Sequence, residues 1–80
     1  MVSKKIETII EEIKIANQRY YNIEEIGTPE KRLAFQMVNS INKQALSLVE
    51  TKEDLDALKE IVLYGTDAHR EIEKRLSVLI

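Results

Sequence analysis

The apolar positions in the C-terminal part of the chain form its longest regular pattern. They are separated alternately by three and four residues, the spacing of a helix that buries one face. These positions are Leu55, Leu58, Val62, Gly65, His69, Ile72, Leu76 and Leu79. Because the spacing keeps its phase throughout, we expect one long helix over residues 52–80, straight or bent at Gly65. The alternative is a break at residues 64–67, with Gly65 ending one helix and Thr66 capping the next.

Two earlier stretches show the same periodicity and predict helices over residues 3–23 and 29–49. The first stripe consists of Val2, Ile6, Ile9, Ile13, Ala16, Tyr20 and Ile23. The second consists of Ala34, Val38, Ile41, Ala45 and Leu48. Gly27 suits a left-handed turn, Thr28 an N-cap and Pro29 a first helical position, so this boundary is strongly marked. Ser3 and Thr51 are the expected N-caps of the other two helices.

Short connections between helices favour antiparallel neighbours, so these segments predict an all-α, antiparallel three-helix bundle with a long C-terminal helix. At about 1.5 Å per residue, that helix would be roughly two turns too long for its partners. We therefore expect an apolar overhang at its C-terminal end. The overhang would contain Leu76, Val78, Leu79 and Ile80.

The composition supports one helical domain spanning residues 1–80. Helix-forming residues dominate, with two glycines and one proline among 80 residues. The absence of cysteine removes disulfides as a source of stability, which favours a cytoplasmic protein. Glu7, Glu11 and Glu12 interrupt any signal-peptide core, and no apolar run approaches the ~20 residues of a membrane span.

Charge and motif content limit the chemistry that we expect. Twelve basic and fourteen acidic residues are interspersed and give a net charge of −2, so nucleic-acid binding is disfavoured. The sequence has no cysteine nucleophile, glycine-rich phosphate loop or recognisable metal-ligand spacing. We expect no cofactor, no metal and no enzymatic activity, and solvated ion pairs for the spaced carboxylates.

His69 and Gly65 are unusual members of the third stripe. We favour a buried, neutral His69 that is hydrogen-bonded to a neighbour such as Tyr20, over a general base, metal ligand or pH switch. We favour Gly65 as a close-packing position opposite Met37, over a hinge. The alternative function follows from the same residues: a ligand-binding or catalytic pocket lined by Tyr20, Met37, Gly65 and His69.

Tyr21 and Phe35 lie away from the main apolar stripes. Each is either a scattered surface residue or an anchor of a contact surface, since tyrosine and other aromatic residues are common at interfaces. Together with Leu76, Val78, Leu79 and Ile80, they are our interface candidates.

The size and the three-helix pattern are similar to those of the helical chorismate mutases, whose intertwined dimers build a site from arginines and lysines. The arginines here, Arg19, Arg32, Arg70 and Arg75, do not match that family's motif. The chain is also similar to the small bacteriocin-immunity bundles, which lack cysteine and have an apolar C-terminal helix. Neither resemblance rests on a motif, so neither transfers a residue role.

The sequence thus favours a small cytoplasmic interaction protein: an inhibitor, immunity factor, adaptor or assembly subunit. It would act by burying an apolar helical surface against a partner or a second copy of itself, and self-association would also add stability. The competing classes are a small helical enzyme or ligand-binding bundle, and a dimeric nucleic-acid binder.

Overall fold

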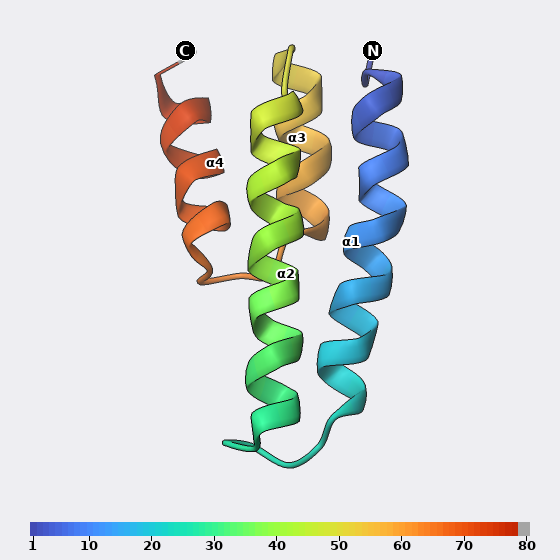
Figure 1. The fold of residues 1–80 in the computed structure, drawn as a ribbon. Coiled ribbons are helices and arrows are strands. Elements are labelled where there is room, and N and C mark those ends of the chain that lie inside the picture. The colour runs from blue at the N-terminus through green and yellow to red at the C-terminus, as the bar shows by residue number, and fades with distance from the viewer. Residues whose placement is uncertain (79–80) are drawn as a thin grey trace.

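The computed structural model describes residues 1–78, which contain four α-helices and no strand. The helices are α1 (Lys4–Asn22), α2 (Pro29–Leu48), α3 (Lys52–Ile61) and α4 (Asp67–Ser77). They run alternately down and up, so that both ends of the chain lie at the upper end of the molecule in Figure 1. The predicted all-α class is confirmed, but the number of helices is four rather than three.

The turn between α1 and α2 follows the local chemistry of its residues. Gly27 has a φ of 82°, the left-handed conformation that glycine adopts without steric cost. Thr28 is the N-cap of α2, because its side chain accepts a hydrogen bond from Lys31 N at 3.2 Å. Lys31 Nζ in turn donates to the backbone oxygens of Tyr20 and Ile23, at 3.0 and 2.7 Å, where α1 ends. A cation is favourable at this negative end of a helix, so α1 and α2 are joined firmly.

The expected long helix over residues 52–80 is wrong, because the chain turns back after α3. Gly65 has a φ of 85° and therefore cannot continue a right-handed helix. Thr66 caps α4 by accepting from His69 N at 3.2 Å, and it also donates to Leu63 O at 2.8 Å. The break that the sequence offered as the alternative is the one that forms.

The regular spacing of the apolar stripe does not distinguish one long helix from two antiparallel helices. Two antiparallel helices that pack on the same core each turn one apolar face inward, whether or not one continues the other. Leu58 on α3 and Ile72 on α4 are both fully buried in this way. The predicted overhang of a long helix does not exist, since α4 runs back beside α2 towards the upper end in Figure 1.

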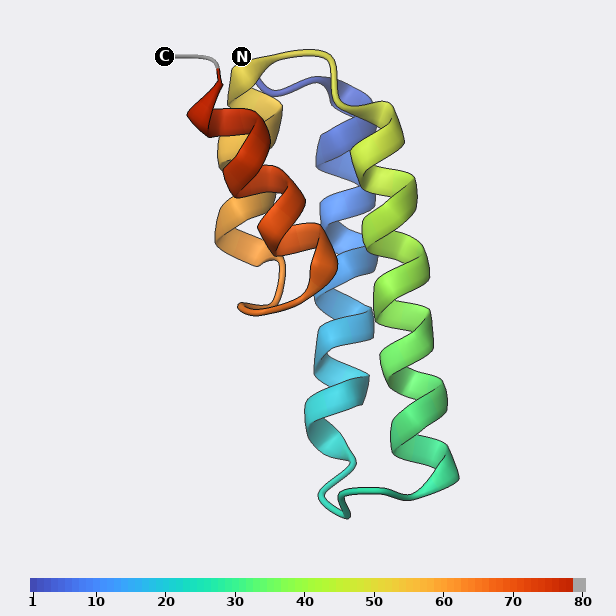
Figure 2. The ribbon, with the colours of Figure 1, turned by 90° about the vertical axis from the view of Figure 1, so that its left-hand side faces the viewer.

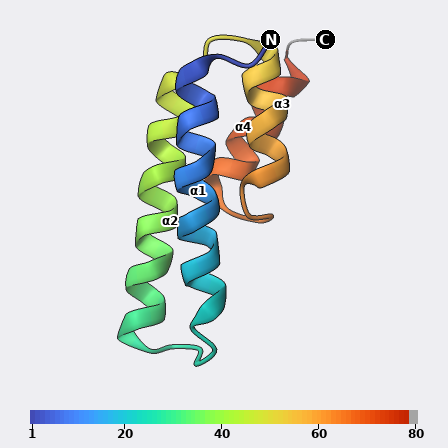
Figure 3. The same ribbon diagram turned by 90° about the vertical axis from the view of Figure 1, so that its right-hand side faces the viewer.

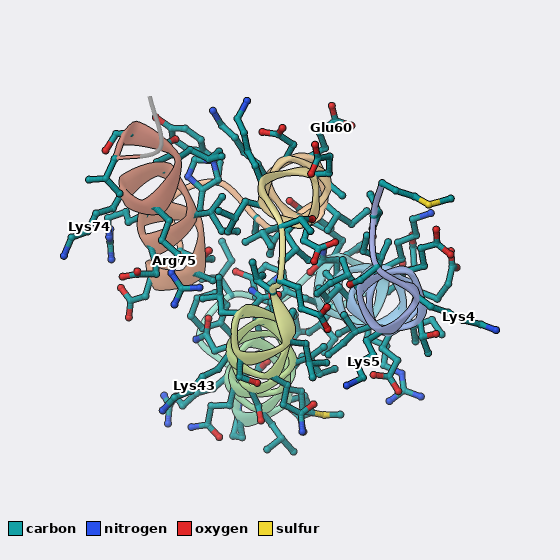
Figure 4. All side chains as sticks on the ribbon, turned by 90° about the horizontal axis from the view of Figure 1, so that it is seen from above. Lys4, Lys5, Lys43, Glu60, Lys74 and Arg75 are labelled. Atoms are coloured by element: carbon teal, nitrogen blue, oxygen red, sulfur yellow. The ribbon has the colours of Figure 1, made fainter. Side chains whose placement is uncertain are left out.

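The core lies between the four helices. Each helix packs mainly against two others, in the cyclic order α1, α2, α4 and α3. The main buried cluster contains Ile6, Ile9, Ile13, Ala45, Leu55, Leu58, Val62, Ala68 and Ile72. Seen from above, Lys4, Lys43, Glu60 and Lys74 point outward, away from this interior (Figure 4). Arg75 lies between α4 and α2, where it donates to Leu46 O at 3.3 Å.

The two layers of helices differ in length. Helices α1 and α2 have 19 and 20 residues, whereas α3 and α4 have 10 and 11. Helices α3 and α4 therefore lie beside only the upper half of the α1–α2 hairpin (Figures 2 and 3). We call residues 16–38 the distal half of the hairpin. The side of the hairpin that packs against α3 and α4 is uncovered in this half, and we call that uncovered face the step.

Replacing Gly65 tests whether its role is conformational. The close-packing explanation predicted from the sequence is wrong, because a Cβ built at Gly65 meets no atom within 4 Å. We expect Gly65→Ala to lower the free energy of unfolding by about 1 kcal/mol, since an L-residue is strained at positive φ. Gly65→Asn, which tolerates this conformation better, should lose less. Urea unfolding measures both, and an unchanged Gly65→Ala variant would contradict this account.

Candidate functional site

Asp54 is the most unusual ionisable group in the molecule, because its side chain is fully buried. Its Oδ1 accepts from Ser3 N at 2.7 Å, and its Oδ2 accepts from Ser3 Oγ, Glu50 N and Thr51 N at 3.1, 2.9 and 3.2 Å. Its own backbone N–H donates to Thr51 Oγ1 at 3.1 Å, which completes a capping box at the start of α3. Ser3, the expected side-chain cap of α1, thus gives its hydroxyl to Asp54 instead.

The hydrogen bonds decide the protonation state of Asp54. Burial raises the pKa of this carboxyl, but the hydrogen bonds from Ser3, Glu50 and Thr51 outweigh burial and hold the pKa below its ordinary value. A buried carboxylate with a perturbed pKa is often a catalytic candidate. Here both oxygens are occupied by donors of the same chain, so we assign Asp54 a structural role in tying α1 to α3.

His69 lies in the second candidate cluster, at the start of α4. It is buried as expected, but its neighbours are Glu73 and Tyr64 rather than Tyr20. Its Nδ1 lies 3.3 Å from Glu73 Oε1, and its ring centroid lies 4.9 Å from that of Tyr64. Within residues 1–78, no group of three or more His, Asp and Glu side chains is arranged to hold a metal ion.

Two asparagines place polar atoms in the interior. Asn17 Nδ2 donates to Ile61 O at 2.9 Å, which joins the middle of α1 to the end of α3. Asn17 Oδ1 and both polar side-chain atoms of Asn42 are buried without a hydrogen-bond partner. The hydrogen bond from Asn17 is thus a polar contact between α1 and α3 at the edge of the apolar interior.

An open groove follows the seam between α1 and α2 on the face away from α3 and α4. Its upper part has a volume of about 550 Å³, and a further hollow of about 230 Å³ continues it, with Glu12 lining both. The upper part is lined by Lys5, Thr8, Ile9, Glu12, Gln44, Ser47 and Leu48. The continuation is lined by Glu12, Ile15, Ala16, Arg19, Met37 and Ile41.

The structure places the four predicted pocket residues in three surroundings. Gly65 and His69 belong to the turn between α3 and α4 and to the start of α4. Met37 lines the hollow between α1 and α2, whereas Tyr20 packs against Phe35. The proposed pocket required a continuous third helix that would have brought His69 near Tyr20, and the turn at Gly65 removes that helix.

Tyr20, Tyr21 and Phe35 form an aromatic cluster on the distal half of the hairpin. The ring centroids of Tyr20 and Tyr21 are 5.7 Å apart, with the rings edge to face, and those of Tyr20 and Phe35 are 5.5 Å apart. Lys31 Nζ lies 4.1 Å from the Tyr20 ring centroid, a cation–π contact. Tyr21 is 63% exposed and Phe35 is 37% exposed. Two interface candidates that the sequence treated separately are therefore parts of one surface.

The C-terminal interface candidates have different surroundings. Leu76 is half-buried and packs against the core cluster, and Val78 is exposed. Leu79 and Ile80 lie outside the described residues. The expected apolar patch at this end is therefore represented in the structure by Val78 alone.

Most of the large apolar side chains that remain exposed lie between residues 15 and 37. In this part of the chain they are Ile15, Tyr21, Ile26, Leu33, Phe35 and Met37, and the others among residues 1–78 are Met1, Tyr64 and Val78. Ile26, Lys31 and Tyr64 were not among the interface or pocket candidates predicted from the sequence. Ile26 and Tyr64 each precede a turn glycine, so the sequence could have shown that they lie in exposed turns.

Comparisons with known proteins give no further guide to the site. The chain matches no family model, and no curated protein or solved structure is significantly similar to it. Among residues 1–78, no helix combines the length and the apolar character needed to cross a membrane.

Removing the charge of Asp54 tests its structural role. In Asp54→Asn, an amide N–H₂ replaces one oxygen and faces N–H groups that need an acceptor. We expect the free energy of unfolding to fall by roughly 2–3 kcal/mol in urea titrations. Asp56→Asn, at an exposed position of the same helix, is the control and should change it by less than about 0.5 kcal/mol. Equal effects of the two substitutions would refute the role.

The pH dependence of stability gives an independent test of Asp54. Its pKa is lowered in the folded state, so its contribution is complete above the ordinary aspartate value of 3.8 and is lost as pH falls through the folded pKa. The free energy of unfolding should therefore decrease below about pH 4 in the parent protein. The Asp54→Asn variant should lack this part of the decrease. Parallel acid profiles for the two proteins would contradict the assignment.

Proposed function

We propose that this chain is a small protein-interaction module that acts by burying the aromatic cluster of its α1–α2 hairpin. The observation that supports this most directly is that Tyr20, Tyr21 and Phe35 pack together just beyond the part of the hairpin that α3 and α4 cover. Tyr21 lies one turn beyond Asn17, which bonds the end of α3, and Phe35 lies one turn before Asn39, which lines a hollow with α4. Aromatic side chains supply much of the binding energy at protein interfaces, because they bury a large area with little loss of conformational entropy.

The surroundings of the cluster suit a role in binding. Tyr20 is held between its two ring neighbours and Lys31, so the cluster is ordered before a partner arrives. Lys31 also holds the end of α1 through two backbone oxygens. A rigid anchor loses less entropy on binding than a mobile one, which favours this surface over an isolated exposed side chain such as Leu33.

The proposal keeps the class of function expected from the sequence but moves the surface. The sequence placed the main patch at the C-terminal end, whereas α4 uses Leu76 to pack against the core. An inhibitor, an immunity factor, an adaptor and an assembly subunit all remain compatible with a binding surface on the hairpin. The alternative, a ligand-binding or catalytic bundle, would use the groove between α1 and α2, whose floor contains Ile9 and Leu48.

Site-specific photo-crosslinking tests the proposed surface. A photoreactive phenylalanine derivative replaces Tyr21 in one variant and Ile15 in the other, and each is irradiated both as purified protein and in an extract of its native cells. We expect a discrete covalent protein adduct at position 21 and several-fold less at position 15. Both positions are more than half exposed, so the comparison controls for accessibility.

The identity of the adduct matters less for this test than its position. An adduct with any protein, a second copy included, supports the proposal when it depends on position 21 and is suppressed by Phe35→Ser in the same chain. Equal labelling at positions 15 and 21, or no adduct in either sample, would overturn the proposal.

A further inference from the structure

We infer that the occupant of the step is a second copy of this chain, related to the first by a two-fold axis. This inference rests on the proposed function and identifies the partner of the same surface. In the pair, the distal halves of two hairpins pack face to face and antiparallel. Each then supplies to the other the second layer that α3 and α4 supply to the upper half.

The dimensions of the helices make the step self-complementary. At about 1.5 Å per residue, the 19 residues of α1 span about 28 Å and the 10 residues of α3 span about 15 Å. The uncovered length of the hairpin is thus close to the covered length. Figure 3 shows the resulting outline, with a vacant corner below α3 and α4. Two such outlines related by a two-fold axis fill each other's corner, as an isologous interface requires.

The cluster lies on the faces that would be covered. Asn17 binds Ile61 of α3, and Tyr21 lies one turn further along the same face of α1. Asn39 lines a hollow with Asp67 and Ala68 of α4, and Phe35 lies one turn before it on α2. Tyr21 and Phe35 therefore continue the faces that pack against α3 and α4 in the upper half.

The exposed area is close to what a specific dimer needs. An aromatic side chain carries about 200 Å² of surface. At exposed fractions of 63%, 37% and 90%, Tyr21, Phe35 and Tyr64 together leave roughly 400 Å² per copy accessible. With Ile26 and the flanking side chains, two copies would bury about 1,000 Å², the lower bound for a specific interface. We therefore expect a reversible dimer rather than an obligate one.

In this arrangement the outer end of the step of one copy would contact the inner corner of the step of the other copy. Ile26, which is 92% exposed, lies in the α1–α2 loop at the outer end, and Tyr64 lies in the α3–α4 turn at the inner corner. Antiparallel pairing brings the loop of one copy against the turn of the other. Lys31, the charged residue of the cluster, already has two carbonyl acceptors and the Tyr20 ring, so pairing buries no unpaired charge there.

Sedimentation equilibrium of the purified protein tests this pairing. We expect a reversible monomer–dimer equilibrium whose dissociation constant rises at least about tenfold in Tyr21→Ser, because an isologous interface loses the same side chain twice. Ile15→Ser is the matched control and should leave the constant within about twofold, since residue 15 lies about 120° away around α1, in the groove with Met37. Circular dichroism at low concentration checks that both variants fold.

Hydrogen exchange at two protein concentrations locates the interface. Amides of residues 17–24 and 31–38 should exchange several-fold more slowly at high concentration, while those of α3 and α4 change little. A strict monomer at every concentration would overturn the pairing. The proposed function would then be decided by the crosslinking experiment in cell extract. A dimer that is disrupted by Ile15→Ser and not by Tyr21→Ser would overturn both.

Discussion

The carboxylate of Asp54 is the interaction on which the rest of the architecture depends. It accepts four hydrogen bonds, two from Ser3 and one each from Glu50 and Thr51, and so fixes the start of α3 beside the start of α1. These donors offset the cost of burying a charge. They belong to the N-cap residue of α1 and to the two residues before α3, whose N–H groups have no partner within a helix. With α3 fixed at this end, its length decides how much of the hairpin is covered.

Gly65 sets that length. Because α3 ends before it and α4 returns beside α2, the apolar faces of both short helices enter one core around Ile72 and Leu58. The aromatic cluster is left beyond the ends of both helices. The step is thus a direct consequence of the turn, and the same turn removes the long apolar overhang expected from the sequence.

Helix boundaries set by neighbouring residues could be predicted from the sequence, but contacts between residues far apart in the chain could not. Gly27, Thr28 and Pro29 determine a helix boundary through their own backbone preferences, and the structure has α2 begin at Pro29 as expected. The apolar stripe through Gly65 could not show that the chain turns back there, since one long helix and two antiparallel helices bury the same residues. Asp54 fits a helix N-terminus in any case, and its main partner, Ser3, is 51 positions away. Tyr21 and Phe35 were recognised singly, because the contact of Phe35 with Tyr20, which joins them into one cluster, depends on how α1 packs against α2.

The separation between Ser3 and Asp54 also bears on how the molecule assembles and opens. The contact closes a segment of 51 positions, whereas the α1–α2 hairpin needs only a short loop. Loop-closure entropy therefore favours early formation of the hairpin and later docking of the α3–α4 pair. The reverse path is the undocking of that pair as a cooperative unit, with the hairpin still helical. The amides of α3 and α4 would then report a lower opening free energy than those in the middle of α1.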